Sequence, residues 1–114
     1  MVTPGPASII VVGFPFSDLS GAKLRPAVVL TSAGRGDWIL CQITSNPHRD
    51  PQAVKLTPVT LKAGALTSIS FARPTKLFTA HESLMTKRVA ILRDETFREI
   101  VLTTIGALQK ALPK

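Results

Sequence analysis

The chain alternates short apolar runs, rich in β-branched residues, with proline, glycine and polar residues. Residues 9–14 read IIVVGF, residues 26–31 read PAVVLT and residues 38–44 read WILCQIT. Runs of this length and composition are typical of strands. Two shorter runs, residues 53–56 and residues 67–71, predict further strands. The chain is therefore expected to fold mainly into β-structure.

Polar segments connect the expected strands. Residues 15–24 contain Pro, Ser, Asp and Gly and predict a loop, while residues 32–37 predict a hairpin turn. Residues 45–52 predict a second polar loop, and residues 62–66 are expected to link the two shorter strands. Long loops on a small β domain are often functional, so the first loop is a place to look for a site.

A single helix is expected at the C-terminal end. Asp94 is a suitable N-cap, and Pro113 would stop the helix. The apolar positions that approximate helical spacing are Phe97, Ile100, Val101, Ile105 and Leu108. The 114 residues fit one domain, residues 1–114. The expected fold class is mainly β (α+β), a small barrel of about five to seven short strands with a C-terminal helix.

The charge balance favours a polyanionic partner. Fourteen Lys and Arg against seven Asp and Glu give a formal net charge of +7, and such a surplus favours nucleic acid through counterion release. Residues 51–81 contain no acidic residue but hold Lys55, Lys62, Arg73 and Lys76. This stretch predicts either one basic face or an ordinary solvated surface.

Two sets of residues are candidates for chemistry on phosphate. Pro26 biases Arg25 toward an extended conformation, which places its guanidinium at the junction of the first loop and the second strand. A guanidinium there can stabilise the charge of a phosphorane transition state. Thr44 and Ser45 end the third strand, where their hydroxyls can bond to a 2′-hydroxyl or a phosphate oxygen. The alternatives are a surface arginine and hydroxyls that bond within a local turn.

Neither Arg25 nor Thr44 is a general base at neutral pH, so removal of a proton needs another group. His48 follows Thr44 closely and is a candidate acid or base, with a solvated loop histidine as the alternative. Phe16 is a candidate for stacking on an unpaired base, with a core position as the alternative. His81 has no evident partner and is interpreted as structural.

Several classes of chemistry find no support in the sequence. One Cys, two separated His and seven scattered carboxylates give no metal-ligand spacing, and the glycine patterns of nucleotide cofactors are absent, so no cofactor is expected. Cys41, flanked by apolar residues, predicts a buried thiol without a reactive role. There is no signal peptide or membrane helix in the pattern, which is compatible with a cytoplasmic protein that does not contact membranes.

The segment at residues 14–30, FPFSDLSGAKLRPAVVL, resembles the N-terminal signature of the MazF/PemK family of toxin endoribonucleases. The resemblance continues through QITS at residues 42–45, SFARPTKL at residues 70–77 and IGAL at residues 105–108. It implies an SH3-like barrel, a homodimer with RNA across its interface, and sequence-specific cleavage at short sequences in single-stranded RNA. It also implies a cognate antitoxin whose tail blocks that groove, with binding to DNA in complex with the antitoxin.

The resemblance also implies roles for individual residues. The family's catalytic arginine and threonine fall on Arg25 and Thr44, and Ser45 follows as a supporting contact. Cleavage in the family resembles in-line attack by the 2′-hydroxyl, without metal, to give a 2′,3′-cyclic phosphate and a 5′-hydroxyl. The further residues expected to contact RNA are Lys23, Ser20, Phe16, His48, Arg73 and Lys76. One departure is Ala7-Ser8, where the family commonly has Gly-Asp.

Two other functions remain open at this point. A small basic barrel can bind nucleic acid or protein without cutting anything. A toxin of the same fold can instead act on DNA gyrase, and that group is understood to depend on its C-terminal helix rather than on an Arg-Pro loop. The pairs Arg25-Pro26 and Thr44-Ser45 favour the ribonuclease.

Overall fold

A computed structural model describes residues 3–15, 22–47 and 49–114 of the chain. These residues form seven strands, two short 3₁₀ helices and one α-helix. The strands are β1 Ser8–Pro15, β2 Ala22–Gly34, β3 Asp37–Thr44, β4 Val54–Leu56, β5 Leu61–Gly64, β6 Ser70–His81 and β7 Met85–Leu92. The helices are η1 Pro58–Thr60, η2 Glu82–Leu84 and α1 Asp94–Gln109.

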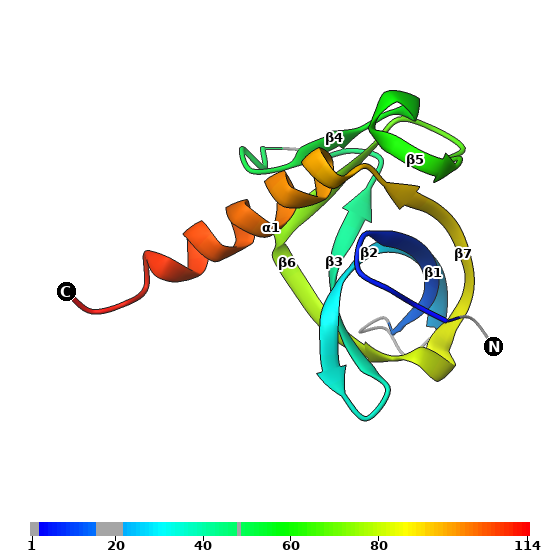
Figure 1. The fold of residues 1–114 in the computed structure, drawn as a ribbon, viewed down its shortest axis with the longest axis horizontal. Helices are drawn as coiled ribbons and strands as arrows, with labels where there is room; N and C mark the ends of the chain where they lie inside the picture. Colours follow the sequence, from blue (N-terminus) through cyan, green and yellow to red (C-terminus); the bar gives the residue numbers. More distant parts are fainter. Residues whose placement is uncertain (1–2, 16–21, 48) are drawn as a thin grey trace.

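The strands form one antiparallel sheet in the order β4-β6-β3-β2-β1-β7-β5. Figure 1 shows that this sheet curls into a barrel, with its edge strands β4 and β5 both at the same end of the molecule. The helix α1 packs on β6 and runs outward, so that the C-terminus lies far from the strands (Figure 1). This arrangement confirms the expected fold class.

Both faces of the central strands are buried. Ile9 and Val28 belong to one apolar cluster, whereas their chain neighbours Ile10 and Val29 belong to a second. Successive side chains of a strand point to opposite faces, so each strand supplies both clusters. This explains why the runs that predict β1, β2 and β3 are apolar throughout and do not alternate with polar residues.

The expectation for β6 was wrong in its extent. The run at residues 67–71 overlaps this strand only at Ser70 and Phe71, and the strand continues through Pro74, although proline inside a run usually argues against a strand. Pro74 is accommodated in β6 by an irregularity in its pairing with β3. Cys41 pairs with Leu77, but the next residue, Gln42, pairs with Arg73, so Pro74 lies in the unpaired part of β6. The ladder is interrupted at the residue that has no N–H to donate.

Two strands were not expected at all, β5 and β7. The residues predicted as a link, 62–66, include most of β5, which is an edge strand with one buried residue, Leu61. In β7, Thr86, Lys87 and Arg88 are exposed in succession, which hides the strand period. The expected loop at residues 15–24 is also shorter than predicted, since β2 already begins at Ala22.

The helix α1 lies where it was expected, with two differences. Its N-cap is Arg93, so Asp94 is the first helical residue and contributes charge to the first turn rather than a cap. Ile100 is buried, but Ile105 and Leu108 are 43% and 62% exposed, because the second half of the helix projects beyond the barrel. No helix among the described residues is long and apolar enough to cross a membrane.

Candidate functional site

A surface cleft of about 420 Å³ lies where the start of β2, the end of β3 and the middle of β7 meet the segment of residues 65–68. Its charged lining residues are Lys23, Arg25 and Lys87, and it also holds the hydroxyls of Thr44 and Ser45. No Asp or Glu lines it in the part of the chain that the structure describes. We call this surface the cationic cleft.

The strand register brings Arg25 and Thr44 together. Ala27 of β2 pairs with Gln42 of β3 at the end of their ladder, and Arg25 and Thr44, each two residues beyond this pair, both line the cleft. Arg25 is half-buried and its Nε is shielded from solvent, so the protein surrounds part of the guanidinium and restricts its motion. The two residues expected to carry the chemistry therefore share one cleft.

The Thr44 hydroxyl is engaged in a local turn. It lies 3.1 Å from the carbonyl oxygen of Asn46, to which it donates, and accepts from the Asn46 backbone N–H at 3.2 Å. These bonds orient the hydroxyl at the end of β3, and its proton is directed to the Asn46 carbonyl oxygen. To donate to a ligand, Thr44 must exchange that bond. Ser45 is exposed beside it.

Lys87 is a cleft residue that the sequence reasoning missed. Val11 of β1 pairs with Pro26 of β2 on one side and with Lys87 of β7 on the other, which carries the lysine into the cleft that holds Arg25. Lys87 is exposed, as is Lys23. A prediction of β7 and of its pairing with β1 would have been needed to find it, because no local motif marks it.

Arg73 and Lys76 do not line the cleft. The Arg73 Nε donates to Asp50 Oδ2 at 2.7 Å, and the Asp50 side chain is only 6% exposed. The Arg73 hydrogen bond holds the pKa of the Asp50 carboxyl below its usual range. Lys76 is exposed on β6.

The acid-free stretch of residues 51–81 does not present one continuous basic face. Arg73 is paired with Asp50, and Lys62 Nζ lies 3.2 Å from Asp94 Oδ1. The remaining lysines of the stretch, Lys55 and Lys76, are exposed on β4 and β6.

Other candidates divide into those the structure describes and those it does not. Phe16, Ser20 and His48 lie outside the described residues. His81 is exposed, and its Nδ1 accepts from the Ser83 backbone N–H at 3.1 Å, which fits its structural interpretation. Cys41 is fully buried, and burial raises the pKa of its thiol to about 12, as expected for an unreactive group.

The cationic cleft has the chemistry of a phosphate-chain site. Three cations, with no carboxylate among the described lining residues, attract successive phosphates, and a guanidinium supplies a fork of donors to non-bridging oxygens. Among the described residues, no group of three or more His, Cys, Asp and Glu side chains is placed to hold a metal ion.

Fold and site together define a small antiparallel β-barrel protein with a cationic, carboxylate-free cleft at the ends of its central strands. The family model described as PemK-like, MazF-like toxin of type II toxin-antitoxin system matches residues 6–107. The chain therefore belongs to this toxin family, which confirms the resemblance of its N-terminal segment. Among curated proteins, none matches the chain by sequence.

Solved structures with the same fold agree with this assignment. A MazE-MazF crystal structure from Deinococcus radiodurans has a TM-score of 0.75 at 18% identity, covering 93% of this chain and 96% of the other. A mycobacterial endoribonuclease in complex with its cognate antitoxin has a TM-score of 0.73 at 12% identity, covering 97% and 100%. The Mycobacterium tuberculosis toxin MazF-mt6 has a TM-score of 0.68 at 15% identity, covering 90% and 96%. At these identities the likeness establishes the fold alone.

Proposed function

We propose that the protein is the toxin of a type II toxin-antitoxin pair and acts as a metal-independent endoribonuclease on single-stranded RNA. The observation that carries this proposal is the joint position of Arg25 and Thr44 in the cationic cleft. Family membership supplies the class of protein, and the cleft supplies a place for a polyanion.

In the proposed reaction, the 2′-hydroxyl oxygen of one nucleotide attacks the adjacent phosphorus in line. The bond from phosphorus to the 5′-oxygen breaks, which yields a 2′,3′-cyclic phosphate and a 5′-hydroxyl. The 2′-hydroxyl proton passes to a general base, and the leaving oxygen takes up a proton. Arg25 stabilises the charge that develops on the non-bridging oxygens, and Thr44 and Ser45 hold the ribose or phosphate. His48 is the sequence candidate for proton transfer.

Incubation of the purified protein with single-stranded RNA in excess chelator tests this function. The wild-type protein is expected to produce cyclic phosphate ends, and Arg25→Ala is expected to slow cleavage about 10²- to 10³-fold, because it removes a donor to the developing charge. Thr44→Val keeps the shape of the side chain and is expected to slow it less. RNA left uncut by folded wild-type protein would refute the proposal.

An antitoxin is the proposed protein partner. Two of the similar structures are described as complexes, one as MazE-MazF and one with a cognate antitoxin. For this chain, we expect an acidic segment that covers the cationic cleft, since three cations and no carboxylate among the described lining residues favour it. The product of a short acidic reading frame beside the gene should copurify with the toxin and block its cleavage of RNA.

A homodimer is likewise proposed, on the resemblance described above. Analytical ultracentrifugation of the purified protein checks it: a single species of twice the 12.2 kDa chain mass is expected.

A non-catalytic RNA-binding barrel is the second candidate function. It is favoured by the Thr44 bond to Asn46 and by the absence of His, Asp and Glu among the described residues of the cleft. RNA that binds to the cleft but stays intact would support it. Intact RNA together with inhibition of DNA gyrase would instead support the gyrase-directed toxin.

A further inference from the structure

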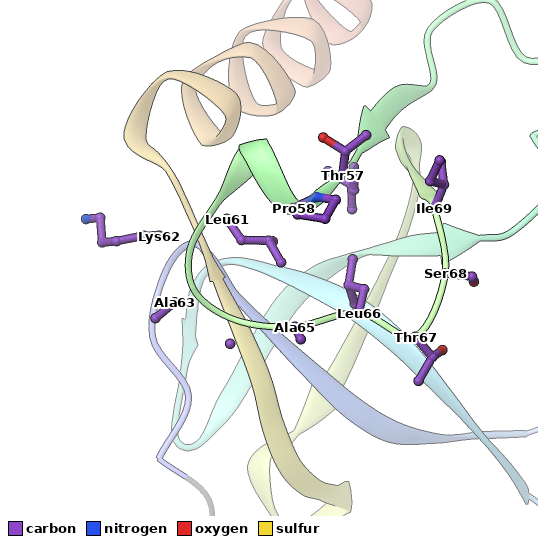
Figure 2. Close-up of a pocket in the computed structure, with 12 residues that line it drawn as sticks. Thr57, Pro58, Leu61, Lys62, Ala63, Ala65, Leu66, Thr67, Ser68 and Ile69 are labelled. Atoms are coloured by element: carbon purple, nitrogen blue, oxygen red, sulfur yellow. The ribbon is translucent and has the colours of Figure 1, made fainter.

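A second cavity, of about 340 Å³, lies behind the wall of the cationic cleft. It is formed by the end of β4, by η1, by β5 and by residues 65–69. Figure 2 shows Pro58, Leu61 and Leu66 pointing toward one another across it, while Thr67 and Ser68 point outward from the loop. The second cavity is thus an apolar hollow, and the Thr67 and Ser68 side chains point away from it.

The two cavities share a wall. Ala65, Leu66, Thr67 and Ser68 line the second cavity and also the cationic cleft. A ligand that lies in the cleft therefore reaches the second cavity by passing this one segment.

The shared wall is tied to the barrel at both ends. At its start, Gly64 has a φ of +79°, and a Cβ there would lie 2.2 Å from the carbonyl oxygen of Val89. The next residue, Ala65, donates its N–H to that same Val89 oxygen at 3.1 Å. At its end, the Ser70 hydroxyl donates to the Ser68 carbonyl oxygen at 3.1 Å. These contacts fix the position of residues 65–68 relative to the barrel. A segment that distinguishes one ligand from another must be fixed in this way.

The second cavity is suited to a neutral, flat group rather than to a phosphate. Among its described lining residues only Lys62 is charged, and its Nζ is 3.2 Å from Asp94 Oδ1. Ile69, which also lines the cavity, is 52% exposed and offers apolar surface for stacking. Proteins bind unstacked bases partly through such apolar contact to the ring faces.

We propose that the second cavity is a nucleobase subsite, which takes an unstacked base next to the phosphate held in the cationic cleft. Residues 65–68 are then the segment that determines sequence preference. The proposal rests on the proposed function, because the phosphate in the cleft is what presents the base to the wall.

Sequencing of cleavage sites in a random single-stranded RNA pool tests the subsite. Leu66→Phe fills the cavity, and Thr67→Val removes a hydroxyl of the shared wall at constant shape. Each variant is expected to change the preference for one base at one position beside the cut by about tenfold, with the same chemical ends. Thr79→Val, an exposed threonine of β6 outside both cavities, is the matched control and keeps the wild-type preference. A wild-type profile from both folded test variants overturns the proposal.

Titrations followed by amide NMR separate this proposal from the proposed function. An uncharged nucleoside is expected to shift the amides of residues 61–69 in wild-type protein but not in Leu66→Phe. Inorganic phosphate is expected to shift Lys23, Arg25 and Lys87 in both. If wild-type protein leaves RNA uncut, the nuclease proposal fails and the nucleoside titration alone decides the subsite. Absence of nucleoside shifts at residues 61–69 then overturns it.

Discussion

Arg73 and Arg25 both precede a proline, yet only Arg25 lines the cationic cleft. The Arg73 Nε is bonded to the nearly buried carboxylate of Asp50, which also accepts from the Gln52 backbone N–H at 3.0 Å. An arginine that neutralises a buried carboxylate has a structural role. Asp50 thus ties the polar loop after β3 to β6, beside the turn that orients Thr44.

The depressed pKa of Asp50 predicts how stability depends on pH. Its folded pKa lies below the ordinary value of 3.8, so its contribution to stability is fully present above that value and is lost as the pH falls through the lower, folded pKa. Asp50→Asn is expected to lower the free energy of unfolding at pH 7 by about 1–3 kcal/mol, because it removes a charged acceptor. Urea unfolding measured from pH 7 down to pH 2 checks this.

The matched control is Asp94→Asn, which removes an exposed carboxylate from the Lys62 pair. Its effect on stability should be smaller than that of Asp50→Asn at pH 7. If the two variants lose the same stability at every pH, Asp50 has no special role in the fold.

At the scale of elements, the helix α1 is fastened to the sheet at the irregular part of β6. The Thr104 hydroxyl lies 2.9 Å from the carbonyl oxygen of Pro74 and 3.0 Å from that of Ile100. Thr104 and Pro74 are both buried. One hydroxyl thus satisfies a strand carbonyl at the place where the sheet ladder is interrupted.

Thr104→Val is expected to cost about 1–3 kcal/mol of unfolding free energy, since the Pro74 carbonyl oxygen loses its hydroxyl donor inside the protein. Thr103→Val is the comparison variant, because the Thr103 hydroxyl bonds at 2.7 Å only to Glu99, within the same helix. Urea unfolding of both variants measures the difference. Equal losses would show that the contact between helix and strand adds nothing beyond the helix itself.

The sequence predicted those elements whose residues are apolar on both faces. The runs that became β1, β2 and β3 are buried in two clusters, so their composition alone marks them. It did not predict β7, whose exposed Lys87 and Arg88 interrupt the pattern, or the full length of β6, where Pro74 occurs at a break in pairing. Arg25 and Thr44 were found through local motifs. Lys87 lies in the same cleft because β7 pairs with β1. This pairing joins residues far apart in the sequence, so no local motif predicts it.

At the scale of the whole molecule, the net charge of +7 is less informative than where the cations lie relative to the carboxylates of the described residues. Lys62 and Arg73 are paired with Asp94 and Asp50, whereas the cationic cleft has no carboxylate among its described lining residues. If the cleft is the RNA site, binding should depend on these particular cations and not on the total charge.

This difference predicts the salt dependence of RNA binding. Three cleft cations should give a slope of log Kd against log salt of about 2, since each phosphate contact with single-stranded nucleic acid contributes about 0.7. Lys87→Gln is expected to lower that slope by about 0.7 and to weaken binding about tenfold at low salt. Lys110→Gln removes the same charge from an exposed position just after α1 and should leave the slope unchanged. Fluorescence anisotropy with 2′-O-methyl RNA, which has no hydroxyl to attack with, measures both without cleavage. Equal effects of the two substitutions would mean that RNA binding depends on the total charge of the protein. The proposal that the cleft is the RNA-binding site would then be wrong.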